Sequence, residues 1–228
     1  MSAFARHSKP ARAVFFDLDG TLADTAADLA APVNAMRAER GLEPLPLDAL
    51  RPFASMGARG LIGRGLGVDR DDPDFEALRI DFLGRYEAAM MVHTRLFPGM
   101  SDVLDALEAQ GVAWGVVSNK VERYVRPILD ALGLLQRSIA TVGGDTTPFA
   151  KPHPEPLLHA ARIAVIAPSD CVYVGDDLRD IEAGQAAGMR TVAAAYGFCG
   201  AAQPPATWGA DALIETPSDL RALLRLSR

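Results

Sequence analysis

The most constraining feature of this 228-residue sequence is a series of short apolar runs that end in polar residues and alternate with helical patterns. Continuously apolar runs are typical of strands in a parallel sheet whose two faces are both covered by helices. The alternation therefore predicts an α/β fold with a doubly wound, mostly parallel sheet. The predicted strands lie at residues 12–17 (RAVFFD), 112–119 (VAWGVVSN), 171–176 (CVYVGD), 190–197 (RTVAAAYG) and 211–215 (DALIE).

Two helices after the predicted strands carry clear boundary signals. The apolar spacing of residues 101–111 predicts a helix that begins with Ser101 as its N-cap and stops at Gly111. Near the C-terminus, Thr216 is the expected N-cap and Pro217 the first helical residue.

One interval is too long for a simple strand–helix–strand unit, which takes roughly 30 residues. Most of the chain between the first two predicted strands reads as helical, with one helix expected from Thr25 to Gly41 and another within residues 72–91. A Pro-Gly turn in LFPGM then leads back to the sheet. We expect a core of residues 1–24 and 96–228, a helical cap at 25–95, and a loose tail at residues 1–10.

Composition limits the class of partner. The net charge of −6 argues against nucleic acid, which favours a basic surface, but leaves room for a small phosphorylated metabolite. Cys171 and Cys199 have no metal-ligand spacing and suggest reduced thiols in a cytoplasmic protein. No stretch reaches the roughly 18 apolar residues of a membrane helix, so no membrane partner is expected. The sequence leaves the oligomeric state open.

Polar side chains follow three of the predicted strands, and the carboxyl ends of parallel strands are where ligands bind. A lysine flanked by prolines in KPHPEP comes before the strand at 171–176. Together these residues predict a polar site at one edge of the sheet, formed by Asp17, Asp19, Ser118, Asn119, Lys151, Asp176 and Asp177.

The chemistry of this set suits phosphate transfer. Clustered carboxylates are ligands that Mg²⁺ prefers, and a bound metal relieves the repulsion between them. Asp17 can act as a nucleophile that forms an aspartyl-phosphate, and Asp19 can serve as general acid and then as general base. Ser118 and Lys151 can hold the phosphate oxygens.

The motifs DLDGTLADT, SN, KP and GDDLRD, in this order, resemble those of the haloacid dehalogenase superfamily of phosphatases. The resemblance implies a Rossmann-like core with an α-helical cap inserted after the first strand. It also implies Mg²⁺ held by Asp17, the backbone carbonyl of Asp19 and Asp176. The remaining implied roles are phosphate binding by Ser118, Asn119 and Lys151, and support of the site by Thr21, Asp177 and Asp180.

Two phosphatase families within the superfamily are similar over most of the chain. VGGDTTPFAKPHPEPLL, GMRTVAAAYGF and MGARGLIGRGL resemble bacterial phosphoglycolate phosphatase, which makes 2-phosphoglycolate the first expected substrate. DDPDFEALRIDFLGRYE and VHTRLFPGM are similar to N-acetylmuramic acid 6-phosphate phosphatase, the alternative. Substrate choice is expected to lie in the cap, where Arg59 and Arg64 are candidates for contact with an anionic substrate, or are simply solvated.

Competing interpretations remain for several residues and for the activity. Ser118 and Asn119 could cap the next helix, Lys151 could be a surface lysine, and Asp180 could be an ordinary first-turn acid. A dehalogenase would need neither Asp19 nor a metal ligand such as Asp176. A sugar phosphomutase or a non-catalytic binding protein on the same fold are the further alternatives.

Overall fold

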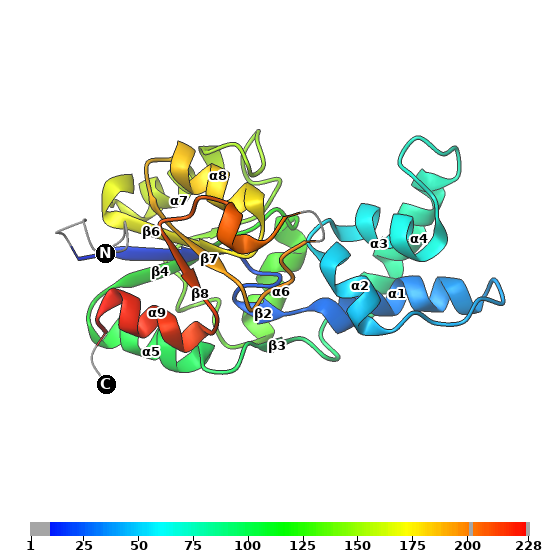
Figure 1. Ribbon diagram of the computed structural model, residues 1–228, viewed down its shortest axis with the longest axis horizontal. Helices are drawn as coiled ribbons and strands as arrows, with labels where there is room; N and C mark the ends of the chain where they lie inside the picture. The colour runs from blue at the N-terminus through cyan, green and yellow to red at the C-terminus, as the bar shows by residue number, and fades with distance from the viewer. Residues whose placement is uncertain (1–9, 201–202, 227–228) are drawn as a thin grey trace.

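Six parallel strands form the central sheet of the computed structural model (Figure 1), which describes residues 10–200 and 203–226. The tail predicted over 1–10 lies, apart from Pro10, outside the described residues. The strand order is β5-β4-β1-β6-β7-β8, which confirms the predicted doubly wound α/β class. The strands are β1 (Ala13–Phe16), β4 (Ala113–Val117), β5 (Thr141–Val142), β6 (Cys171–Gly175), β7 (Arg190–Ala194) and β8 (Ala212–Ile214). The two-residue β5 is too short for an apolar pattern and was not predicted.

Helices cover both faces of this sheet because successive strand side chains point to opposite sides. Phe16 and its same-face neighbours pack with α5 (Met100–Ala109), α6 (Glu122–Ala131) and α9 (Pro217–Leu224). Phe15 lies on the other face and packs with α7 (Glu155–Ala164) and α8 (Leu178–Ala186). Short 3₁₀ turns lie at η2 (Pro168–Asp170) and η3 (Pro205–Thr207). No helix in the described ranges is long and apolar enough to cross a membrane.

Four further helices pack on one another at one end of the molecule, on the right in Figure 1. We call them the helical insert: α1 (Ala26–Ala38), α2 (Leu47–Ala54), α3 (Gly57–Leu66) and α4 (Phe75–Ala89). The chain enters the insert through β2 (Ala23–Asp24) and leaves it through β3 (Arg95–Leu96), which pair in antiparallel fashion. The two connections therefore lie side by side and hold the insert at one edge of the sheet.

Hydrogen bonds to a buried carboxylate connect the first helix of the insert with the segment that follows its last helix. Asp28, in the first turn of α1, is 2% exposed. It accepts hydrogen bonds from the backbone amides of His93 and Thr94 at 2.9 Å and from the Thr94 hydroxyl at 2.7 Å. A buried carboxylate is stable when hydrogen bonds replace its lost hydration, so this contact fixes the second connection against α1.

The predicted helix boundaries hold only in part: α1 ends at Ala38, before the expected stop at Gly41, and α5 starts earlier than expected. Ser101 was expected to be an N-cap, but α5 already begins at Met100, because Gly99 adopts φ +84° in the Pro-Gly turn and takes the cap position. At the C-terminus the expected start is confirmed: α9 begins at Pro217, after Thr216. The alternative that Ser118 and Asn119 cap a helix does not hold, because α6 begins at Glu122 with Val121 as its N-cap.

Candidate active site

The loops after β1, β4 and β6 meet at one edge of the sheet because these three strands are neighbours with the same direction. A cavity of about 490 Å³ lies at this edge, between the sheet and the helical insert. It brings together most of the residues predicted from the sequence. Those that line it are Asp17, Asp19, Ser118, Asn119, Lys151, Asp177 and Asp180.

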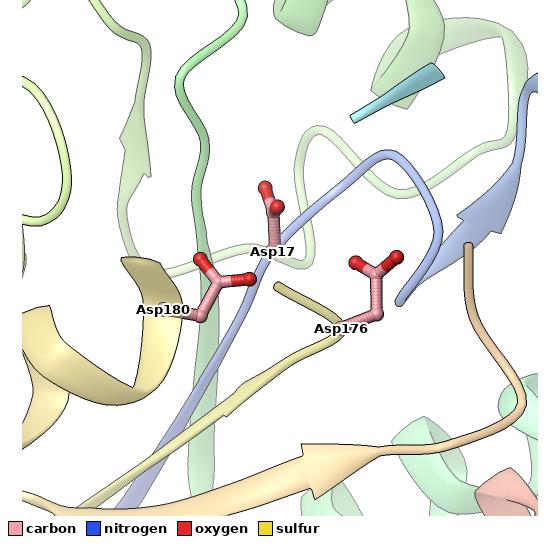
Figure 2. A group of neighbouring side chains, drawn as sticks. All are labelled: Asp17, Asp176 and Asp180. Carbon is pink, nitrogen blue, oxygen red and sulfur yellow. The ribbon is translucent and has the colours of Figure 1, made fainter. Parts of the chain in front are cut away.

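Three carboxylates converge beside this cavity (Figure 2). One oxygen each of Asp17, Asp176 and Asp180 lies within 4.8 Å of the others. Asp176 is fully buried and accepts hydrogen bonds from the Thr21 hydroxyl at 2.9 Å and from the amide of Phe198 at 2.8 Å. The predicted supporting residue Thr21 thus contacts the cluster through Asp176.

The loop after β1 approaches Asp176 closely enough to require a glycine. Gly20 has φ +84°, and a Cβ atom built there would lie 2.1 Å from Oδ2 of Asp176. A side chain at this position would both strain the backbone and displace the carboxylate. Gly20 therefore permits the close approach of the β1 loop to the β6 loop.

Lys151 is a buried cation within the cluster. Its Nζ lies 3.1 Å from Asp17 and 2.7 Å from Asp180, and it donates to the carbonyl of Val117 at 3.0 Å and to the Tyr173 hydroxyl at 2.7 Å. Burial opposes the charged form of Lys151, but the carboxylates of Asp17 and Asp180 outweigh it and raise the pKa of the ammonium. The alternative that Lys151 is a surface lysine is therefore wrong.

The acidic cluster fits a divalent cation. Burial, and next the charge of Asp17, raise the pKa of Asp176 well above its usual range. Burial also raises the pKa of Asp180, although Lys151 opposes this shift. Within the described ranges, no lysine or arginine forms an ion pair with Asp176. A metal ion with oxygen preference would supply the missing positive charge beside Asp176, which is the chemistry that Mg²⁺ sites provide.

Asp19 lies apart from this cluster. Its carboxylate accepts a hydrogen bond from the Thr25 hydroxyl at 2.6 Å and pairs with Nζ of Lys120 at 2.9 Å. Thr25 occupies the N-cap position of α1 as expected, but its side chain holds Asp19 rather than capping the helix. Sequence reasoning missed Lys120, although it directly follows the Ser118–Asn119 pair.

Ser118 and Asn119, in the loop after β4, make hydrogen bonds with neighbouring loop residues. The side-chain amide of Asn119 donates to the carbonyl of Lys151 at 2.9 Å and accepts from its amide at 2.9 Å, which fixes the lysine loop. The Ser118 hydroxyl, 3% exposed as a residue, accepts from the amide of Lys120 at 3.3 Å. Ser118 and Asn119 both line the cavity.

Asp177 forms the N-cap of α8 and binds an arginine that sequence reasoning missed. Arg179 donates to both of its carboxylate oxygens, at 2.8 and 2.9 Å. Burial would raise the pKa of Asp177, but the hydrogen bonds and charge of Arg179 lower it overall. Arg179 therefore favours the ionised form of Asp177, which is not part of the acidic cluster.

The helical insert supplies the wall of the cavity opposite the sheet. Arg79, Phe82 and Tyr86 lie on one face of α4, at the i, i+3, i+7 spacing that could have revealed them. The two arginines proposed from the sequence lie elsewhere. Arg59 lines a separate pocket on the insert, and Arg64 donates to the carbonyl of Ala49 at 3.3 Å.

Comparison with known proteins agrees with this geometry. A family model described as haloacid dehalogenase-like hydrolase matches residues 14–194. An N-acetylmuramic acid 6-phosphate phosphatase from Pseudomonas putida is 43% identical over 93% of this chain and 96% of that protein. A phosphoglycolate phosphatase from Xanthomonas campestris is 47% identical over 92% of this chain and 94% of that protein. A crystal structure of a predicted phosphoglycolate phosphatase from Haemophilus somnus superposes with a TM-score of 0.83 at 28% identity, over 95% and 99% of the two chains.

Proposed function

Because this chain belongs to the haloacid dehalogenase-like hydrolase family and is a phosphatase, we propose that it hydrolyses a small phosphomonoester through a phosphoryl intermediate on Asp17. The observation that carries the proposal is the position of Asp17. Its carboxylate lines the cavity, lies 3.1 Å from Lys151 and belongs to the acidic cluster. A carboxylate in this place, paired with a buried lysine, is a ready nucleophile.

Two steps follow from this assignment. In the first, an oxygen of Asp17 attacks the phosphorus, the ester P–O bond breaks, and Asp19 gives its proton to the leaving alkoxide. In the second, Asp19 takes a proton from a water that attacks the aspartyl-phosphate, which releases phosphate and restores Asp17. Lys151 and Ser118 bind the phosphate oxygens during both steps.

We propose Mg²⁺ as the cofactor. Asp17, Asp176 and the backbone carbonyl of Asp19 would hold it, and Asp180 would support the site. When bound, the ion would offset the combined negative charge of the phosphate and the carboxylates. The support for this set is the cluster of Asp17, Asp176 and Asp180, together with the lack of a protein cation at Asp176 in the described part of the chain.

The substrate has two candidates. The relatives named phosphoglycolate phosphatase support 2-phosphoglycolate. The cavity adds an observation in favour of N-acetylmuramic acid 6-phosphate, the substrate in the name of two other relatives. With about 490 Å³ and an apolar wall from Phe82 and Leu83, it offers more space and apolar surface than a glycolate group fills. The geometry gives no support to a phosphomutase over a phosphatase.

We also propose that residues 25–95 act as a cap domain on a core of residues 1–24 and 96–228. The support is that the insert walls the cavity and that its two connections pair at Ala23–Leu96 and Asp24–Arg95. Cys171 and Cys199 are free, which fits the expected cytoplasmic location. That location stays a prediction.

Phosphate release by the purified protein with Mg²⁺ tests the proposal, with 2-phosphoglycolate and N-acetylmuramic acid 6-phosphate compared side by side. We expect release from at least one of them and a clear preference between the two. Release from neither ester, nor from p-nitrophenyl phosphate, would contradict the proposed function.

A further inference from the structure

Each of the two aspartates proposed for catalysis pairs with its own buried lysine. Lys151 pairs with Asp17, where the phosphate is expected to bind. Lys120 pairs with Asp19, with Nζ at 2.9 and 3.1 Å from its two oxygens, and its side chain is 8% exposed. Since Asp19 is proposed to serve the ester oxygen, the ammonium of Lys120 lies on the side of the alcohol that leaves.

The helical insert approaches the same ammonium from across the cavity. Nζ of Lys120 lies 4.7 Å from the centre of the Tyr86 ring, a distance at which the ring face attracts a cation. Tyr86 is 2% exposed, and its buried hydroxyl, beside Lys120, makes no hydrogen bond of standard geometry with the described residues. A buried hydroxyl without a well-formed hydrogen bond is costly, and Tyr86 lines the cavity, so a polar ligand group beside Lys120 would stabilise it.

We propose that Lys120, with the Tyr86 hydroxyl, binds a carboxylate on the alcohol part of the substrate. This inference rests on the proposed function and names the substrate class of the same site. A cation 2.9 Å from Asp19 can reach an anionic group that is a few bonds from the ester oxygen. A carboxylate there would pair with Lys120 and accept a hydrogen bond from Tyr86, which satisfies both groups.

Both candidate substrates carry a carboxylate, close to the ester oxygen in the first and farther from it in the second. In 2-phosphoglycolate it is bonded to the carbon next to the ester oxygen, and in N-acetylmuramic acid 6-phosphate it belongs to the lactyl ether of the sugar. Each has a neutral counterpart, ethyl phosphate for the first and N-acetylglucosamine 6-phosphate for the second. The first pair differs little in size, whereas the second pair loses the carboxylate together with the rest of the lactyl group.

The experiment measures kcat/KM for all four esters with Mg²⁺ in the wild type and in Lys120→Met, which removes the charge and keeps the chain length. In the wild type we expect one pair to show a clear preference for its carboxylate member. That pair identifies which of the two candidate substrates the protein hydrolyses. Lys120→Met should lower kcat/KM for that member by about 10- to 100-fold. Because Lys120 also contacts Asp19, the variant should slow the neutral member as well, but by a clearly smaller factor.

Two further variants sharpen the result. Tyr86→Phe keeps the ring and loses the hydroxyl, and it should reduce the same preference by a smaller factor. Arg126→Met removes a cation of α6 that pairs with Glu122 outside the cavity, and it should leave the preference unchanged.

Equal losses on both members of the pair in Lys120→Met would overturn the proposal, because Lys120 would then act only through Asp19. A wild type that hydrolyses the neutral esters as well as the carboxylates would also overturn it, whether or not the variant folds. The proposed function would survive either result, since it fails only if the wild type releases phosphate from no ester.

Discussion

Arg179 in α8 donates a hydrogen bond to the main-chain carbonyl of Ser55, the residue that follows α2, at 2.8 Å. The same guanidinium binds the carboxylate of Asp177 through two of its nitrogens. One side chain therefore joins the helical insert to the loop after β6, beside the acidic cluster. Because the cavity lies between these two parts, this contact joins its two walls.

Replacing Arg179 should loosen this contact without removing a reacting group. We expect Arg179→Met to raise KM by roughly three- to tenfold, with a smaller change in kcat, as for the loss of a hydrogen bond to a charged group. Steady-state kinetics on the preferred ester measure both constants. Arg85→Met, which breaks ion pairs with Glu39 and Asp81 inside the insert, is the matched control and should leave KM unchanged.

Asp17→Asn should abolish turnover while the protein remains folded. The substitution removes both the proposed nucleophile and a carboxylate of the acidic cluster, but keeps the shape of the side chain. Phosphate release should fall to background, and the circular dichroism spectrum should match that of the wild type. Measurable turnover by this variant would show that another residue is the nucleophile.

Asp19→Asn should slow the hydrolysis of alkyl phosphates by about 10²–10⁴-fold, the usual contribution of a general acid or base. Formation of the intermediate from p-nitrophenyl phosphate should suffer less, because p-nitrophenolate leaves without a proton. The burst of p-nitrophenolate in rapid-mixing experiments measures this first step. An equally large loss in the burst would argue against proton donation by Asp19.

Removal of divalent cations should abolish activity, and Mg²⁺ should restore it. Mg²⁺ should also raise the melting temperature, because a ligand that binds only the folded state stabilises it and here offsets repulsion among buried carboxylates. Thermal unfolding with EDTA and with Mg²⁺ measures the shift. Asp176→Asn should lose most of it, and a shift of the same size in this variant would place the metal elsewhere.

The stability of the metal-free protein should fall as the pH rises from about 4 to 7. Burial raises the pKa of Asp180 from 3.8 to about 7, so in this range the folded state holds a proton that the unfolded chain releases. The free energy of unfolding therefore decreases through this range, and burial of Asp176 acts in the same direction. Melting curves in EDTA at pH 5 and 7.5 test the sign, and Asp180→Asn should flatten the dependence. A melting temperature that rises with pH would contradict the prediction.

Five of the six strands of the central sheet and the order of the sequence motifs were predictable because each depends on local pattern. Asp17 and Asp176 end apolar runs, and strand order along a parallel sheet brings such ends together. The start of α5 was misplaced by two residues because the conformation of Gly99 outweighed the capping preference of Ser101. The substrate arginines suggested from the sequence, Arg59 and Arg64, do not line the cavity, since a charge pattern does not tell which face of a helix meets the core.

The sequence alone determined the α/β class, the edge of the sheet that carries the site, and the residues proposed for phosphate chemistry. Tertiary structure decided what surrounds them. The approach of Tyr86 to Lys120, and of Arg179 to Ser55, depends on how the helical insert packs against the core. Local periodicity carries no information about that packing. It determines which residues share a helix face, but not which part of the protein that face packs against.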